Sequence, residues 1–163
     1  MPYLSATLIV FFTVFSNANA ACTRAGVAGP WKGTGSVVLT ATHQRIPFSF
    51  SDHFKLSSQE LKGHMVFRTT GGVPIPPLID QILSETYHVQ FMHGDAITFR
   101  SNWGRGKGMW GEETYQLNFH DLSGTVHVNE SGTIRSCDEL TVSGDVFVLG
   151  VKVASTVIEY QRP

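Results

Sequence analysis

The segment Phe99–Trp110 concentrates the side chains of this sequence that are best suited to bind a ligand. Three cations and two tryptophans alternate there with glycines, and no acidic residue lies between Asp95 and Glu112. Arg and Lys donate charge-assisted hydrogen bonds to phosphate, sulfate or carboxylate groups, and indole rings offer flat apolar faces. The segment would therefore suit an amphiphile with an anionic head group, or an acidic glycan. The predicted ligand contacts are Arg100, Trp103, Arg105, Lys107 and Trp110.

A structural role is the alternative for this segment, as a long hairpin loop whose tryptophans close a barrel and whose cations are solvated. Its glycines Gly106, Gly108 and Gly111 match the spacing of the dinucleotide fingerprint G-x-G-x-x-G. That fingerprint binds a pyrophosphate only where a helix follows the glycines. Residues 112–119 have the alternation of a strand instead. We therefore expect no bound nucleotide and no cofactor.

Histidine is the commonest protein ligand for transition metals, and the chain contains 7 histidines. None of them forms a His-x-His pair, which would place two rings on one face of a strand. His120 and His127 differ in parity, so they would point to opposite faces unless a turn lies between them. No metal site is predicted. The seven are His43, His53, His64, His88, His93, His120 and His127.

Hydrolytic chemistry has no clear motif either. The chain lacks the strained G-x-S-x-G turn that presents a nucleophilic serine. Glu112 and Glu113 are adjacent, so in a strand they would face apart and could not act as a pair. The triplet Asn129-Glu130-Ser131 is a glycosylation acceptor, which we expect in a turn and which matters only in a eukaryotic source.

Period-two alternation dominates the sequence from Trp31 onward and predicts strands with one buried face. Turns are expected at His93–Asp95, at Asp121–Gly124 and at Ser143–Asp145. After the last of these, the run Phe147–Val153 is predicted to be a strand that buries its odd-numbered residues. The fold class is therefore all-β, an antiparallel barrel of about eight to ten strands, with a β-sandwich as the alternative.

One short helix is predicted at Pro77–Glu85, where four apolar residues form a stripe after a proline. It could plug one end of the barrel or pack on its outside. A barrel of about eight strands can be filled by side chains or can hold one small ligand. Many inward residues are phenylalanines, which favours a filled or narrow interior.

The N-terminus has the pattern of an export signal. The apolar run Leu4–Phe15 is followed by Ala18-Asn19-Ala20, so residues 1–20 are predicted to be a signal peptide and residues 21–163 a single β-barrel domain. The alternative, an uncleaved anchor, would need about 20 apolar residues. The pair Cys22 and Cys137 then predicts a structural disulfide in a secreted or periplasmic protein.

Composition excludes other classes of protein. Hydrophobic residues make up 42% of the chain, which is enough for a sizeable core and argues against disorder. Lys and Arg number 12 against 13 Asp and Glu, so the chain lacks the excess of cations that general nucleic-acid binding requires.

The element Gly29-Pro30-Trp31 at the start of the first predicted strand resembles the G-x-W motif of the lipocalin and wider calycin group. In that group a basic residue near the end of the chain covers the tryptophan, and Arg162 stands in the matching place. The resemblance implies an eight-stranded cup that holds a small apolar ligand. The chain departs from the pattern because it has no downstream T-D-Y-like motif and no helix near its C-terminus.

Three functions follow from these observations. The first is a secreted, non-enzymatic barrel that binds a small hydrophobic or amphiphilic molecule. The second is an isomerase, cyclase or hydrolase that uses a histidine and a carboxylate at the barrel mouth. The third is a surface-interaction protein that uses the loop Trp103–Trp110 to grip a glycan or a protein.

Overall fold

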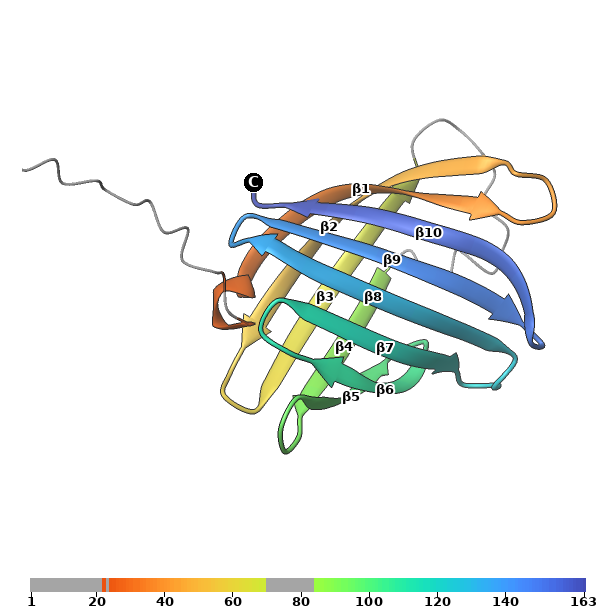
Figure 1. The fold of residues 1–163 in the computed structure, drawn as a ribbon. Helices are drawn as coiled ribbons and strands as arrows, with labels where there is room; N and C mark the ends of the chain where they lie inside the picture. The colour runs from red at the N-terminus through yellow and green to blue at the C-terminus, as the bar shows by residue number, and fades with distance from the viewer. Residues whose placement is uncertain (1–21, 23, 70–83) are drawn as a thin grey trace, which may run out of the picture.

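A computed structural model describes residues 22, 24–69 and 84–163. In this part of the chain, a short 3-10 helix, η1 (Arg24–Val27), precedes ten antiparallel strands (Figure 1). None of its helices has the length and hydrophobicity of a membrane span. The strands are β1 (Gly29–Leu39), β2 (Arg45–Leu56), β3 (Glu60–Thr69), β4 (Ser84–Phe91), β5 (Ala96–Ser101), β6 (Gly104–Trp110), β7 (Thr114–Asp121), β8 (Val126–Ser136), β9 (Glu139–Val148) and β10 (Val151–Gln161).

The sheet closes into a barrel. Each strand pairs with the next one along the chain, and β1 pairs with β10 from Lys32↔Gln161 to Leu39↔Ala154. Closure leaves no strand edge free to pair with another chain. The predicted barrel is thus confirmed over the sandwich. It has ten strands, two more than the cup that the family resemblance implies.

Alternation along each strand separates an inner from an outer face, as predicted. In β2, for example, Ile46, Phe48, Phe50 and Phe54 are all buried, whereas their neighbours are mostly exposed. The predicted turns at His93–Asp95 and Asp121–Gly124 are also present. Their glycines, Gly94 and Gly124, have φ values of 69° and 73°, a left-handed conformation that glycine adopts without strain.

The C-terminal prediction was wrong in its parity except at Val153, which faces the barrel interior as predicted. Residues 143–145 lie inside β9, and the turn comes later, at Leu149 and Gly150, whose φ values are 50° and 81°. Positive φ at both central residues is the mark of the tight hairpin turn that suits twisted strands. Leu149 and Val151 are therefore 80% and 66% exposed instead of buried. A shift of register between Lys152 and Ala154 then lets the even-numbered residues of β10 face inward.

Three other predicted features lie partly or wholly outside the described residues or inside strands: the short helix, the signal peptide and the turn at Asn129. Ser84 and Glu85, which end the predicted helix, belong to β4, and residues 77–83 lie outside the described residues. The predicted signal peptide at residues 1–20 also lies outside them. Asn129 is not in a turn but in the middle of β8, where it pairs with Asn118 and Asp145.

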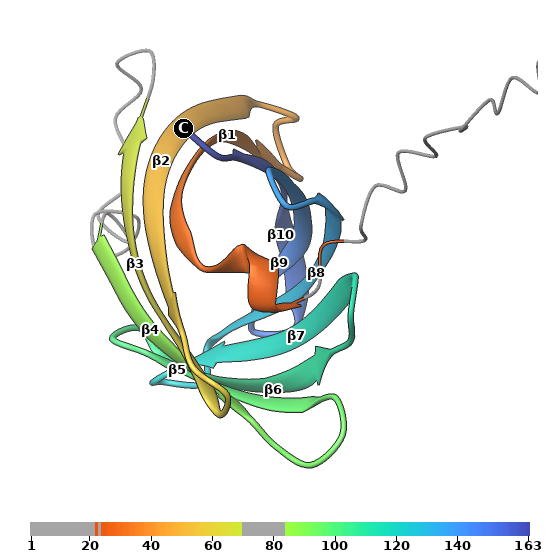
Figure 2. The same ribbon diagram turned by 90° about the vertical axis from the view of Figure 1, so that its left-hand side faces the viewer.

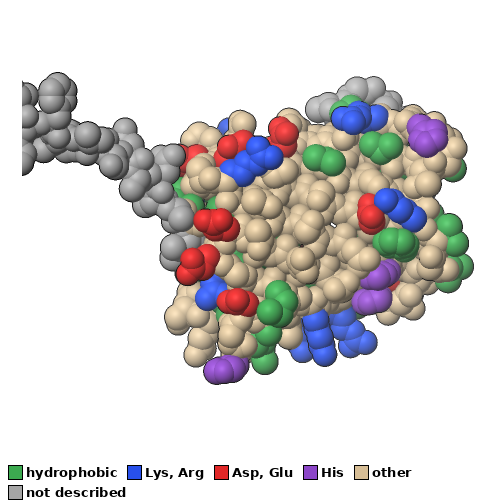
Figure 3. Space-filling model, viewed as in Figure 1, with side chains coloured by type: hydrophobic (Ala, Val, Ile, Leu, Met, Phe, Trp, Pro, Cys, Tyr) green, Lys and Arg blue, Asp and Glu red, His purple; other side chains and the backbone are tan. Residues whose placement is uncertain are grey.

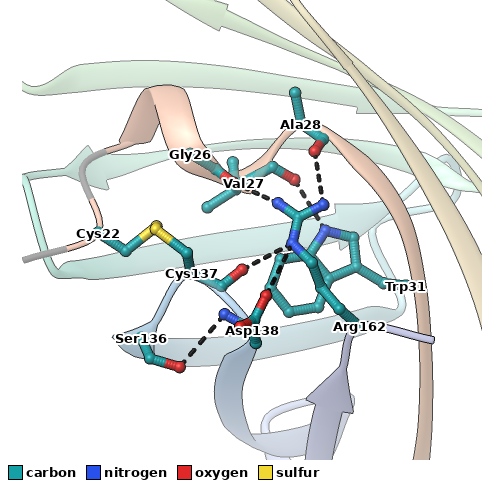
Figure 4. Close-up of a disulfide and its surroundings, with 9 residues drawn as sticks. All are labelled: Cys22, Gly26, Val27, Ala28, Trp31, Ser136, Cys137, Asp138 and Arg162. Carbon is teal, nitrogen blue, oxygen red and sulfur yellow. Dashed lines mark hydrogen bonds and ion pairs between the residues drawn. A yellow bond between two sulfur atoms is a disulfide. The ribbon is translucent and has the colours of Figure 1, made fainter. Parts of the chain in front are cut away.

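One end of the barrel is tied together by a disulfide and a buried tryptophan; we call it the disulfide end (Figure 4). Cys22 is bonded to Cys137 across a sequence separation of 115, as predicted. Helix η1 lies across this opening (Figure 2). Trp31, only 1% exposed, donates from its Nε1 to the carbonyl oxygen of Val27 at 2.7 Å. Cys22 and helix η1 are therefore fixed to the barrel by covalent and polar contacts, respectively.

Arg162 covers Trp31, as the family resemblance implies. Its Cζ lies 4.7 Å from the centre of the indole ring, a cation–π contact. The guanidinium also donates to the carbonyl oxygens of Cys137 at 2.7 Å, of Ala28 at 2.9 Å and of Gly26. One side chain thus joins the end of β10, the segment before β1 and the β8–β9 turn.

Arg162→Ala should lower the free energy of unfolding by about 3 kcal/mol, because it removes the cation–π contact and charge-assisted hydrogen bonds to three carbonyl groups. Denaturant titration would measure the loss. Arg135→Ala, a change at an exposed arginine of β8, should shift the stability by less than about 0.5 kcal/mol. Equal effects of the two changes would contradict this role for Arg162.

Candidate functional site

The barrel encloses a cavity of about 430 Å³, lined by side chains from all ten strands. Most of the lining is aliphatic or aromatic. It includes Leu39, Ile46 and Val148 at the end opposite the disulfide, and Leu61, Val89 and Leu140 toward the disulfide end. The prediction of a filled or narrow interior was therefore wrong.

The aromatic residues leave this space because their rings lie against the barrel wall. Phe50 is paired with Gly33 of the neighbouring strand, and Phe48 is paired with Gly35. A Cβ atom at Gly35 would come within 2.5 Å of the Phe48 ring, so each ring occupies the place of its partner's missing side chain. Tyr87 and Tyr115 lie in the same way over Gly63 and Gly132.

Two tyrosine–carboxyl pairs interrupt the apolar interior. The hydroxyl of Tyr115 donates to Oε1 of Glu130 at 2.7 Å, and both residues line the cavity. The hydroxyl of Tyr87 donates to Oδ2 of Asp52 at 2.6 Å. Asp52 is 3% exposed and also accepts a hydrogen bond from the backbone N–H of His53 at 2.7 Å. A third acid, Glu85, lines the cavity from the start of β4.

Burial favours the protonated form of these acids. Loss of water raises the pKa of Glu130 to about 7 and that of Asp52 to about 6, and the tyrosine hydrogen bonds offset only part of each rise. Burial also raises the pKa of Glu85, against a hydrogen bond with Ser101. Near neutral pH the cavity therefore holds carboxyl groups that can be protonated or ionised. A ligand could donate a hydrogen bond to them or balance their charge.

The cavity lining contains no Lys, Arg or His among the described residues. It does contain Trp110, whose Nε1 is buried and has no hydrogen-bond partner in the described part of the chain. A buried donor without a partner is rare in folded proteins, because it loses its hydrogen bond to water without replacement. The interior thus offers acids and one unused donor within a largely apolar wall.

The structure divides the five predicted ligand contacts between two faces. Trp103 and Trp110 line the cavity, where Trp103 stacks on Phe119 at 4.8 Å between ring centres. Arg100, Arg105 and Lys107 are exposed. The segment is not a long loop but the hairpin of β5 and β6, and strand alternation separates its tryptophans from its cations.

Arg100 and Arg105 belong to a row on the outer face, which we call the basic row. Its members are successive cross-strand partners from β3 to β8. Figure 3 shows Lys and Arg side chains gathered on the surface over β5 and β6, with His side chains next to them. Glu60 contacts Lys62 at 2.6 Å and His88 at 2.7 Å. The basic row consists of Lys62, His88, Arg100, Arg105, His120 and His127.

His120 and His127 lie on the same face because the turn at 121–124 lies between them. They are direct cross-strand partners, with ring centres 4.5 Å apart and rings nearly parallel. His127 in turn stacks on Phe147 at 5.6 Å. Among the described residues, no group of three or more His, Cys, Asp or Glu side chains is placed to hold a metal ion.

Sequence reasoning missed the interior acids, although a signal for them was present. Glu130 shares its parity with the buried residues Val126 and Ile134, and Asp52 shares its parity with Phe50 and Phe54. A carboxyl group on the apolar side of a strand is rarely buried without a reason. Alternation therefore indicates an inward position for both residues. The interpretation of residues 129–131 as a glycosylation triplet did not consider the direction of Glu130.

Comparisons with protein-family models and with curated proteins found no match. Among solved structures, the barrel is similar to a protein of unknown function from the DUF3598 family of Nostoc punctiforme, with TM-score 0.63 and 14% identity over 85% of this chain. The match spans 48% of that protein, about half of its length.

Two further barrels match over most of both chains. The S-type phycobiliprotein lyase CPES from Guillardia theta has a TM-score of 0.64 at 9% identity, and the match covers 85% of this chain and 89% of that one. Rv2717c from M. tuberculosis has a TM-score of 0.62 at 14% identity, with 85% and 93% covered. Such low identities show a shared fold alone, and that fold agrees with the calycin resemblance.

The stability of the protein should fall as the pH rises from 5 to 8. The folded state keeps a proton on Glu130 up to about pH 7, whereas the unfolded chain loses it near the ordinary value of 4.5. The folded state thus binds more protons in this range, so the free energy of unfolding decreases with pH, by about 3 kcal/mol for Glu130. Asp52 adds to the fall only below its pKa of about 6.

Denaturant titration at pH 5, 6.5 and 8 would measure this slope. Glu130→Gln should reduce the fall mainly between pH 5 and 6.5, because glutamine does not titrate and because Glu130 is ionised in both states above its folded pKa of about 7. Glu159→Gln, at an exposed position of β10, should leave it unchanged. An unaltered slope in Glu130→Gln would show that Glu130 titrates normally.

Proposed function

We propose that this chain is a non-enzymatic binding protein that holds a small hydrophobic or amphiphilic molecule inside the barrel. The observation that carries this proposal is the apolar cavity of about 430 Å³. Binding sites for small molecules usually have about 300–1,000 Å³ and an apolar wall with a few polar groups. Glu130, Tyr115 and Trp110 supply such groups here.

The two tryptophans of the predicted site are the proposed aromatic contacts. Trp103 and Trp110 both line the cavity, so a bound apolar molecule would contact their rings. The phycobiliprotein lyase among the structural neighbours supports small-molecule binding by a barrel of this shape, and it does so by analogy of fold alone.

We also propose that the protein acts outside the cytosol, in a secreted or periplasmic setting. The apolar run Leu4–Phe15 before Ala20 supports export. The disulfide between Cys22 and Cys137 supports an oxidising compartment, because such bonds are rare where thiols are kept reduced.

The catalytic alternative finds less support. It requires a histidine and a carboxylate facing one pocket, but no described histidine lines the cavity. The described histidine–carboxylate ion pair is His88 with Glu60, at 2.7 Å. It lies on the outer face, and its side chains are 40% and 35% exposed. Water reaches both groups there, so their acid–base chemistry gains little from the protein.

The surface-interaction alternative is favoured by the basic row. Arg100 and Arg105 of this row, and Lys107 farther along β6, are exposed and have no ion-pair partner among the described residues. Neighbouring cations on adjacent strands lie about 5 Å apart, so one extended anionic chain could contact several of them. An acidic glycan on the outside of the barrel is therefore the second proposed ligand.

Filling part of the cavity should weaken the binding of an apolar probe. A fluorescent fatty-alcohol analogue titrated into the protein should saturate and quench the emission of Trp103 and Trp110. Val128→Trp, which projects a large ring into the cavity, should weaken binding at least tenfold. Val157→Trp makes the same change at an outward position that is 49% exposed, and should bind as wild type does.

Absence of saturable binding to the wild-type protein would refute the carrier proposal. Equal weakening in both valine variants would place the probe elsewhere on the protein. Circular dichroism of each variant checks that the barrel is intact.

The basic row should determine retention on a sulfated polysaccharide. Arg100→Gln/Arg105→Gln should elute from dextran sulfate at a clearly lower salt concentration than wild type, because two charge-assisted contacts are lost. Lys32→Gln/Arg135→Gln removes the same net charge from exposed positions outside the row and should elute close to wild type. Identical elution of the two double variants would mean that only net charge matters.

A further inference from the structure

We propose that the cavity selects an amphiphile whose polar end is a protonated amine. The proposal rests on the proposed function and specifies the ligand of that same site. It follows from the kind of polar groups that the interior contains and from their positions.

Every ionisable side chain that the structure places against the cavity is an acid or a tyrosine. Glu85 and Glu130 line it from β4 and β8, and Tyr87, Tyr115 and Tyr160 line it from β4, β7 and β10. Asp52 lies directly behind Tyr87, to which it is hydrogen-bonded at 2.6 Å. Among the described lining residues no cation balances these carboxyl groups.

Glu130 has room for a partner. Its cross-strand neighbours are Leu117 on β7 and Gly144 on β9, so one side offers only an aliphatic surface and the other no side chain. The hydrogen bond that the structure gives its carboxyl group comes from Tyr115 and occupies Oε1. A donor on a ligand could therefore approach the same carboxyl group from the cavity.

Charge then discriminates between ligands of equal size. An ammonium group beside Glu130 would replace the water that the carboxylate lost on burial, and in this poorly polar space the attraction is stronger than in water. A carboxylate or phosphate head would instead meet like charges. The cations that could bind an anionic head, Arg100, Arg105 and Lys107, are on the outside. An amine is therefore favoured over the anionic head group that the sequence alone suggests.

The preference should grow as the pH rises through the titration of Glu130, because the ionised carboxylate attracts an ammonium group and the neutral acid does not. The groups that face or influence Glu130 are all acidic or phenolic, so none of them opposes this trend. They are Glu85, Tyr115 and Tyr160, and Asp52 interacts in turn with both of these tyrosines.

Three probes of one chain length test the proposal: decylamine, decanol and decanoate, each below its critical micelle concentration. Each displaces a fluorescent apolar reporter from the folded protein at pH 6 and pH 8.5. At pH 8.5, decylamine should bind at least tenfold more tightly than decanol, and decanoate more weakly than decanol. At pH 6 the advantage of the amine should be smaller.

Glu130→Gln should reduce the advantage of decylamine over decanol to less than threefold, because the amide keeps the shape and the acceptor for Tyr115 but not the charge. Circular dichroism checks that the variant folds, and the ratio of its two affinities, both measured on the same variant, isolates the effect of the lost charge. Glu85→Gln tests the second lining acid, and the exposed Glu159→Gln is the matched control with unchanged preference.

Decanoate binding as tightly as decylamine, or an unchanged preference in both Glu130→Gln and Glu85→Gln, would overturn the proposal while leaving a hydrophobic carrier intact. If none of the three probes displaced the reporter, or the reporter itself did not bind, the proposed function would fail as well. The two failures are thus distinguishable.

Discussion

In the described part of this barrel, four aromatic rings lie over the glycine directly opposite them on the neighbouring strand. Phe48, Phe50, Tyr87 and Tyr115 each occupy the space in which their partner would carry a side chain. Rings that lie along the wall still bury their faces, so the core keeps its hydrophobic stabilisation without filling the centre. The cavity depends on these contacts, and so does every interior group that a ligand could reach.

Closure of the barrel adds a second constraint, because every strand then has one face inside and one outside. Strand β6 shows the effect. Lys107 and Trp110 are three positions apart, so they differ in parity and lie on opposite faces of the sheet. The same alternation places the cations of the basic row outside and Glu130 inside. The distribution of charge between interior and surface is thus a direct result of strand geometry.

Much of the fold could be predicted from local patterns. Alternation in β2 and the glycine turns at Gly94 and Gly124 are local features, and the barrel follows from them. The turn at Leu149 was missed because aliphatic residues flank it on both sides and resemble a continuous strand. Only Gly150 indicated the turn, and a left-handed leucine beside it is uncommon.

The interior of the barrel could not be predicted in the same way. Whether a phenylalanine fills a barrel or lies along its wall depends on which residue is its cross-strand partner, and register is not a local property. Gly35 and Phe48 are 13 positions apart in sequence, yet their pairing keeps the Phe48 ring against the cavity wall. The His120–His127 contact is also a matter of register, since it needs the intervening turn to have the right length.

Glu130 is the residue at which local and global preferences conflict most clearly. It takes an inward position in β8 that an aliphatic residue would fill at lower cost, and burial raises its pKa to about 7. Tyr115 reduces that cost but does not remove it, and Asp52 with Tyr87 repeats the arrangement elsewhere in the wall. Departures from local preference of this kind are expected where a protein has a function to perform. A carboxyl group that is costly in the empty barrel becomes favourable once a ligand cation lies beside it, so the destabilisation of the free protein is the counterpart of selective binding.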